Sequence, residues 1–253
     1  VGGDHIALGH FCTLGYVFEA GVGYVFGKRG ENRKSVEDLK LPKNFEFLQD
    51  TYLSLMVVMA PLFLVTVLFA GEDFSSKLSG DTNYIMYAFL QSIQFVVGVY
   101  VLLAGVRLLL GEIVPAFKGI AMKLVPDAKP ALDCPVLFPF SPNAVIIGFI
   151  TTTIGTVIAM FLFPTIGLAM IIPGILTNFF AGGTAGIFGN LTGGLRGAII
   201  GGIAHGLFIT LLPALLVTVL SNMGFVNATA TDVDTVAAAL FYAWIIGPLM
   251  KAF

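Results

Sequence analysis

The stretch KPALDCPVLFPFSPNAVIIGF, residues 129–149, contains four prolines in an otherwise almost wholly apolar run, and one acid, Asp133, lies among them. Each proline removes a backbone N–H donor and clashes with the preceding helical turn, so this strip cannot be an ordinary lipid-facing helix. Irregular backbone at membrane depth is tolerated only where it is packed in protein or lines a water-filled cavity. Two interpretations of Asp133 stay open. It lies at the tip of a re-entrant or half-helix element that binds a solute, or it caps the next helix at the water interface.

The composition indicates that this strip belongs to a membrane protein. Of 253 residues, 57% are hydrophobic and 11% are charged, whereas a soluble domain usually carries about 25% charged residues. About 20 apolar residues let a helix cross a bilayer core of about 30 Å. The sequence therefore predicts an all-α, polytopic membrane protein with discontinuous or re-entrant helices, in contact with membrane lipid and forming one embedded domain over residues 1–253. The apolar blocks are 51–70, 85–106, 144–163, 166–181, 197–220 and 236–250.

The cations predict the orientation, because Lys and Arg are retained on the cytoplasmic side. Residues 28–50 hold six of the thirteen cations, and twelve fall on one side if each apolar block crosses once. This predicts a cytoplasmic 28–50 loop and a cytoplasmic C-terminus. Block 166–181 is short and contains Pro173, so it could also enter and leave the membrane on the same side. In that case the predicted orientation of every later segment would be reversed. The net charge of −2 does not favour binding to nucleic acid.

Ionisable groups inside apolar segments are candidates for function, because they are costly in a bilayer. Asp4, His5 and His10 lie in the apolar, glycine-rich opening of the chain, without a recognised metal-ligand spacing. We interpret them as part of a polar substrate pocket, since imidazole both donates and accepts hydrogen bonds. We expect no metal and no cofactor.

A glycine stripe predicts close helix packing. Glycines recur at every fourth position from Gly189 to Gly201, and His205 continues the register. Residues four apart share a helix face, so another helix can approach closely there with His205 in the interface. A hydrogen-bonded packing histidine is favoured over a proton relay. The chain has no nucleotide-binding motif and no nucleophile–base arrangement, so we do not expect an enzyme.

Several stretches, in collinear order over nearly the whole chain, resemble one transporter family. They are GGDHIALGHF (2–11), KSVEDLKLPKNF (34–45), ALDCPVLFPFSPNAVIIGF (131–149) and MIIPGILTNFFAGGTAGIFGNLTGGLRGA (170–198). They are similar to the L-ascorbate-type permease, the IIC component of the phosphoenolpyruvate-dependent phosphotransferase system. The resemblance implies a homodimer in the bacterial inner membrane, built on an inverted repeat of which this chain is the C-terminal portion. It also implies that a core domain carries the sugar inward. Phosphorylation then comes from a cytoplasmic IIB protein charged through IIA.

The resemblance also implies a binding site. The family's substrate contacts correspond to His10 and Asp133, with Gly9, Asp4, His5 and His205 as second-tier candidates. Phe11 stands where the family carries Gln, so the substrate is expected to be ascorbate or a related sugar acid or pentitol. Two alternatives remain open. One is a proton-coupled secondary transporter acting through Asp133 or His205, and the other is a membrane scaffold without transport of its own.

Overall fold

The computed structural model describes residues 7–9, 12–28, 30, 33–39, 51–123, 131–132, 134–226 and 228–252. Within these residues four helical segments are long and apolar enough to cross a membrane, or five if one bent pair is counted. The prediction of an all-α, polytopic membrane protein is thereby confirmed. The chain packs as two compact units, residues 40–128 and residues 1–39 with 129–253. The reading of residues 1–253 as one domain therefore stays a prediction.

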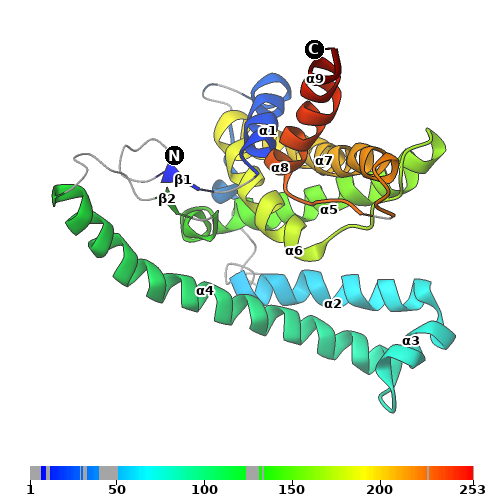
Figure 1. Cartoon of the computed structure of the whole chain (residues 1–253). Helices are drawn as coiled ribbons and strands as arrows, with labels where there is room; N and C mark the ends of the chain where they lie inside the picture. The colour runs from blue at the N-terminus through cyan, green and yellow to red at the C-terminus, as the bar shows by residue number, and fades with distance from the viewer. Residues whose placement is uncertain are drawn as a thin grey trace. The chain divides into compact units, whose positions relative to one another are not determined.

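The unit formed by residues 40–128 contains α2 (Thr51–Ala70), α3 (Glu72–Ser79) and α4 (Tyr84–Lys123) (Figure 1). Helix α2 has no charged residue, and it ends at Gly71, whose φ of 82° is readily reached only by glycine. The side chain of Asn83 begins α4 by accepting hydrogen bonds from the N–H groups of Ile85 and Met86. Helices α2 and α4 pack through a short buried seam of Leu55, Met59, Ala88 and Val99.

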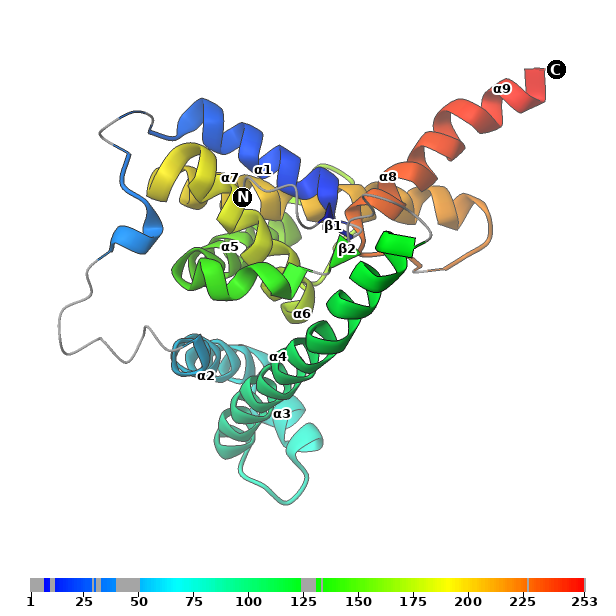
Figure 2. The same ribbon diagram turned by 90° about the vertical axis from the view of Figure 1, so that its left-hand side faces the viewer.

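The second unit holds the remaining elements (Figures 1 and 2). Its helices α1 and α5 each pack closely against α7, and α8 packs on α1 and α7. The elements in chain order are β1 (Ala7–Leu8), α1 (Thr13–Phe26), the 3₁₀ helix η2 (Val36–Asp38), β2 (Ala131–Leu132), the 3₁₀ helix η4 (Cys134–Phe140), α5 (Pro142–Thr165), α6 (Ile175–Thr177), the π-helix η5 (Asn178–Gly182), α7 (Gly183–Asn222), α8 (Val233–Phe241), the π-helix η6 (Tyr242–Ile246) and α9 (Gly247–Ala252).

Helix α7 is a hairpin, and the chain reverses at Gly194. Its first arm is residues 183–193 and its second arm is residues 195–222. The apolar helical stretch Ile175–Asn222 has 48 residues and would be about 72 Å long if straight, far more than a bilayer core of about 30 Å. Gly194 has φ 64° and ψ −158°, a non-helical conformation that favours glycine. A Cβ added at Gly189 would lie 3.1 Å from the carbonyl oxygen of Gly197, although a straight helix would separate these residues by two turns.

This course of the chain bears on two segments that the sequence singled out. The glycine stripe from Gly189 to Gly201 does not lie on one continuous helix, because Gly194 interrupts it. Residues 166–174 are not helical, and the helical course begins only at Ile175, so 166–181 is not an uninterrupted span. The physical reason is that small residues at spacing four suit close packing in either geometry. Pro164 lies in the last turn of α5, and Pro173 lies just before the helical course resumes at Ile175.

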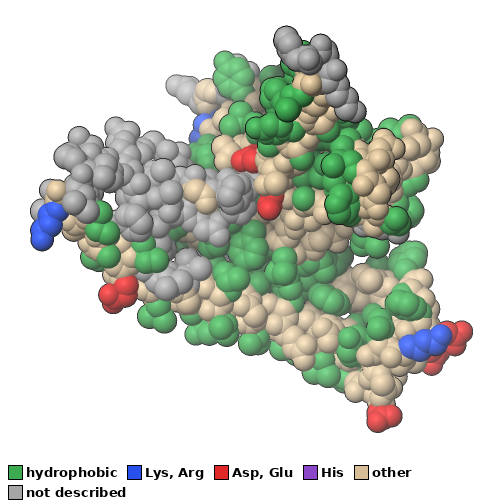
Figure 3. Space-filling model, in the orientation of Figure 1, with side chains coloured by type: hydrophobic (Ala, Val, Ile, Leu, Met, Phe, Trp, Pro, Cys, Tyr) green, Lys and Arg blue, Asp and Glu red, His purple; other side chains and the backbone are tan. Residues whose placement is uncertain are grey.

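Glycine lets α1, α5 and the hairpin meet backbone to backbone. A Cβ added at Gly186 would lie 2.5 Å from the Cα of Gly148 on α5, and one at Gly23 would lie 2.9 Å from the carbonyl oxygen of Gly189. The close approach that the stripe predicts is thus present, with α1 and α5 as the partners. On the described surface, apolar side chains are widespread and charged ones are few, as a bilayer requires (Figure 3).

Candidate functional site

A short parallel strand pair joins the two segments that carry the predicted substrate contacts. Strand β1 pairs with β2 in the register Ala7↔Ala131 and Leu8↔Leu132. The chain leaves both strands at the same end, two residues before His10 and one residue before Asp133. Although 124 residues separate Ala7 from Ala131 in the sequence, the backbone leading to each predicted contact therefore lies side by side.

Most of the predicted site residues fall outside the part of the chain that the structure describes. His10, Phe11 and Asp133 are among these, and so are the second-tier candidates Asp4 and His5. Of the remaining two, Gly9 is exposed directly after β1, and His205 is fully buried in the second arm of α7.

The described part of the proline-rich strip is buried at its start and exposed at Pro139 and Phe140. Directly after Asp133 the chain forms η4, in which Cys134, Pro135, Leu137 and Phe138 are buried. The ring of Phe138 lies 5.4 Å from that of Phe179 in an edge-to-face arrangement, which fixes η4 against η5.

The helix that follows the strip is capped from elsewhere. Helix α5 begins at Pro142, a position where the missing N–H costs nothing. The carboxylate of Glu37 in η2 accepts a hydrogen bond of 2.9 Å from the backbone N–H of Ala144. Burial raises the pKa of Glu37, and backbone hydrogen bonds from Ala144 and Asn143 offset part of that rise. Among the described residues, Glu37 therefore supplies a cap to α5.

The segment after Phe11 is anchored by an acid from a distant helix. Asp234 of α8 accepts hydrogen bonds from the backbone N–H groups of Thr13 (3.0 Å) and Leu14 (2.9 Å), the first residues of α1. These N–H groups have no partner within their own helix. The segment containing His10 and Phe11 is thus held on one side by β1 and on the other by the Asp234 cap. Sequence reasoning missed this role, because Asp234 lies 221 residues from Thr13.

A buried polar pair links α1 to the second arm of α7. Glu19 and His205 are both 0% exposed, and Glu19 Oε2 lies 3.8 Å from His205 Nδ1. The hydroxyl of Thr152 on α5 lies 3.2 Å from the same nitrogen. Within the described chain both Glu19 oxygens and His205 Nε2 lack a hydrogen-bond partner. The inward direction of His205 matches the prediction. Glu19 was missed, although a lone acid in the apolar stretch 13–26 was a visible signal.

A second group of polar side chains lines the contact between α5 and η5. Asn178 is 2% exposed and donates from Nδ2 to the hydroxyls of Thr156 (3.0 Å) and Thr153 (3.3 Å). It begins a π-helical turn, a feature that is frequent at functional sites. The hydroxyl and amide groups of this contact hydrogen-bond to one another and to the backbone of α5. Among the described residues no group of three or more His, Cys, Asp or Glu side chains could hold a metal ion.

Comparisons with known proteins give one family match and one relative. The family model EIIC-GAT, described as a sugar-specific permease component of the PTS system, matches residues 1–234. A protein of Mycoplasma pneumoniae named ascorbate-specific PTS system EIIC component is 27% identical over 212 residues, which cover 73% of this chain and 32% of the relative. The chain thus spans about a third of the length of that curated relative.

Proposed function

The chain belongs to the EIIC-GAT family of sugar-specific permease components of the phosphotransferase system, and on this premise we propose that it translocates a small polyhydroxy substrate. Members of this family are membrane permease subunits and not catalytic enzymes. The family and the apolar helices together indicate a multi-pass membrane protein. The substrate is ascorbate or a related sugar acid or pentitol, and the membrane is the bacterial inner membrane with the 28–50 loop and the C-terminus cytoplasmic.

The parallel pairing of β1 with β2 carries the proposed binding site. It joins the backbone two residues before His10 to the backbone one residue before Asp133. In the proposed site the carboxylate of Asp133 accepts hydrogen bonds from substrate hydroxyls, and His10 donates or accepts one. Phe11 packs against the carbon skeleton of the substrate, where a Gln would form hydrogen bonds. A buried substrate hydroxyl left without a partner costs about 1–3 kcal/mol, so Phe11 selects among related substrates.

The phosphoryl group is proposed to come from a partner. A phosphocysteine on the cytoplasmic IIB protein, charged through IIA, transfers its phosphoryl group to a substrate hydroxyl, releasing the hydroxyl proton and leaving a thiolate on IIB. Cys12 and Cys134 are 2% and 1% exposed, which supports a carrier thiol outside this chain. The unit containing residues 1–39 and 129–253 includes both strands and the polar interior, so we assign to it the role of the moving core domain within a homodimer.

The test uses membrane vesicles that contain the permease and enclose phosphoenolpyruvate and the cytoplasmic relay proteins. A panel of labelled sugar acids and pentitols is offered to the wild type, Asp133→Ala and Phe11→Gln, with Asp73→Ala as the control for loss of an exposed acid. We expect phosphorylated product inside, loss of uptake in Asp133→Ala, and a changed substrate preference in Phe11→Gln. Equal uptake by the wild type and Asp133→Ala would remove the proposed site.

The buried pair of Glu19 and His205 favours a second candidate, a proton-coupled secondary transporter. An ionisable pair inside a membrane is a typical proton carrier, and Nδ1 and Oε2 are only 3.8 Å apart. The same vesicles separate the two candidates. Proton coupling predicts free sugar inside and collapse of uptake on adding an uncoupler, whereas the phosphotransferase relay predicts phosphorylated sugar and loss of uptake without phosphoenolpyruvate.

A further inference from the structure

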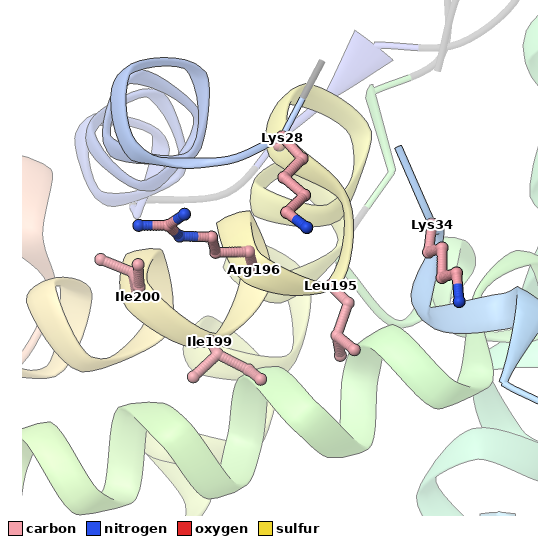
Figure 4. Close-up of a pocket in the computed structure, with 7 residues that line it drawn as sticks. Lys28, Lys34, Leu195, Arg196, Ile199 and Ile200 are labelled. Atoms are coloured by element: carbon pink, nitrogen blue, oxygen red, sulfur yellow. The ribbon is translucent and has the colours of Figure 1, made fainter. Parts of the chain in front are cut away.

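A cavity of about 690 Å³ lies at the turn of the α7 hairpin. Its size falls in the range of about 300–1,000 Å³ that is usual for small-molecule sites. We propose that this cavity, which we call the hairpin cavity, binds a phosphate dianion or a phosphate monoester. Figure 4 shows its cationic side chains around the turn of the hairpin. The lining residues are Lys28, Lys34, Gly193, Leu195, Arg196, Ile199 and Ile200.

The charge of the hairpin cavity points to an anion. Lys28, Lys34 and Arg196 come from three separate places in the chain, and the described lining includes no acid. None of these three cations forms a salt bridge with an acid in the described chain, where the one such contact is between His205 and Glu19. Like charges gathered without counter-ions repel one another, and they attract an anionic ligand.

The nearby acids of η2 are engaged elsewhere. Glu37 accepts the N–H of Ala144, and Asp38 accepts the N–H of Ser35 at 2.9 Å. Arg29 and Glu31 lie outside the described residues. Among the described residues, neither of these two acids forms a salt bridge with a cation of the hairpin cavity.

Backbone hydrogen bonds hold the two lysines at the hairpin turn. The N–H of Lys28 donates to the carbonyl oxygen of Gly193 at 3.0 Å, and the N–H of Leu195 donates to the carbonyl oxygen of Lys34 at 2.9 Å. The guanidinium of Arg33 donates to the carbonyl oxygen of Leu191 at 2.7 Å and so completes the end of the first arm. These bonds fix the chain positions of the cations before any ligand binds, which reduces the entropy lost on binding.

The hydrogen-bonding groups suit phosphate. Arg196 lies in the first turn of the second arm, where the backbone N–H groups give the helix end a partial positive charge. A guanidinium can bind two phosphate oxygens at once, and a lysine ammonium can supply a point charge to another. Ile199 and Ile200 form an apolar wall on the same arm, against which the carbon skeleton of a monoester can pack. The choice of a sugar phosphate as the natural monoester rests on the proposed function, but the anion site does not.

The test measures binding of inorganic phosphate to the full chain in nanodiscs of phosphatidylcholine by isothermal titration calorimetry. We expect saturable binding that weakens with rising salt. Arg196→Gln and Lys34→Gln each weaken it about tenfold, the usual scale for loss of one charge-assisted contact. Arg196→Lys retains the charge and loses less. The matched control is Lys77→Gln, which removes an exposed cation from α3 and leaves binding unchanged.

The lipid composition distinguishes two sources of the phosphate group. If phosphate binds equally in nanodiscs of phosphatidylcholine and phosphatidylglycerol, the site takes a soluble ligand. If binding is lost only in phosphatidylglycerol, and Arg196→Gln lowers retention of that lipid, the ligand is a lipid headgroup. Both results support the anion site. The proposal would be overturned if neither inorganic phosphate nor phosphatidylglycerol bound saturably. It would also be overturned if Lys77→Gln and Arg196→Gln weakened binding equally. Sugar uptake is not part of this readout, so its loss or retention tests the proposed function separately.

Discussion

Replacing Asp234 by alanine removes the cap of α1. The two carboxylate oxygens accept hydrogen bonds from the backbone N–H groups of Thr13 and Leu14, at 3.0 and 2.9 Å. Loss of an N-cap side chain costs about 0.5–2 kcal/mol. Since one side chain here serves two N–H groups, we expect Asp234→Ala to lower the free energy of unfolding by about 2 kcal/mol. Asp234→Asn retains one accepting oxygen, so it should cost about 1 kcal/mol.

The assay is unfolding in mild detergent by added sodium dodecyl sulfate, followed by circular dichroism. The matched control is Asp232→Ala, because Asp232 precedes α8 and its side chain forms no capping hydrogen bond. It should change the free energy of unfolding by less than about 0.5 kcal/mol. The order wild type, Asp234→Asn, Asp234→Ala is the expected ranking. Equal stability of Asp234→Ala and Asp232→Ala would refute the reasoning.

Three further predictions concern the same unit and its neighbour. Glu19→Gln and His205→Asn should each lower the free energy of unfolding, because removing one partner leaves the other buried alone. In the double variant the loss should be smaller than the sum of the two single losses by about 1–3 kcal/mol. Additive losses would show that the two side chains are not coupled. Gly148→Ala should lower the free energy of unfolding by about 1–3 kcal/mol because its Cβ would meet the backbone of the hairpin, whereas Gly105→Ala, which meets nothing within 4 Å, should be neutral or stabilising. Burial raises the pKa of Glu37, so between pH 4.5 and its pKa in the folded protein this side chain binds a proton more readily in the folded than in the unfolded chain. The contribution of Glu37 to the free energy of unfolding is therefore fully present below pH 4.5 and is lost as pH rises through the folded pKa. Unfolding curves of Glu37→Gln should lack this part of the pH dependence, and an unchanged pH profile would contradict the prediction.

The apolar blocks and the prolines were enough to predict much of the fold. The blocks 85–106, 144–163 and 236–250 correspond to the helical spans Tyr84–Gly105, Pro142–Thr165 and Val233–Met250. Their length and lack of charge leave few alternatives in a bilayer. The prolines of the strip after Asp133 likewise predicted that it is not an ordinary α-helix, and η4 is a short 3₁₀ helix whose first half is largely buried.

The reversal at Gly194 could not be predicted from the spacing. A glycine at every fourth position suits one straight helix packed on a neighbour and equally suits two arms packed on each other. Only the φ of 64° at Gly194 distinguishes the two courses, and any glycine of the stripe could have supplied it. The irregular course of residues 166–174 escaped the hydropathy pattern for a related reason, because an apolar segment need not be helical when protein surrounds it.

The polar contacts depend on pairings between distant parts of the chain. Glu19 stands out as an acid in an apolar stretch, but its neighbour His205 lies in a helix from the other end of the chain. The cap from Asp234 to Thr13 is another such pairing. A single sequence can mark one partner, as it does for Glu19, but it contains no signal for which distant residue that partner meets. The roles of His10, Phe11 and Asp133 remain predictions from the family resemblance.

The glycine contacts among α1, α5 and the hairpin have a mechanical consequence. Helices that meet through side chains can slide by small rotamer changes, as in shear motions of packed helices. At Gly186 and Gly148 the two backbones touch directly, with an added Cβ at Gly186 only 2.5 Å from the opposing Cα, so there are no rotamers to absorb such a displacement. We therefore expect α5 and the hairpin to move as a rigid block, with any bending confined to the non-helical stretches that join them to the rest of the chain.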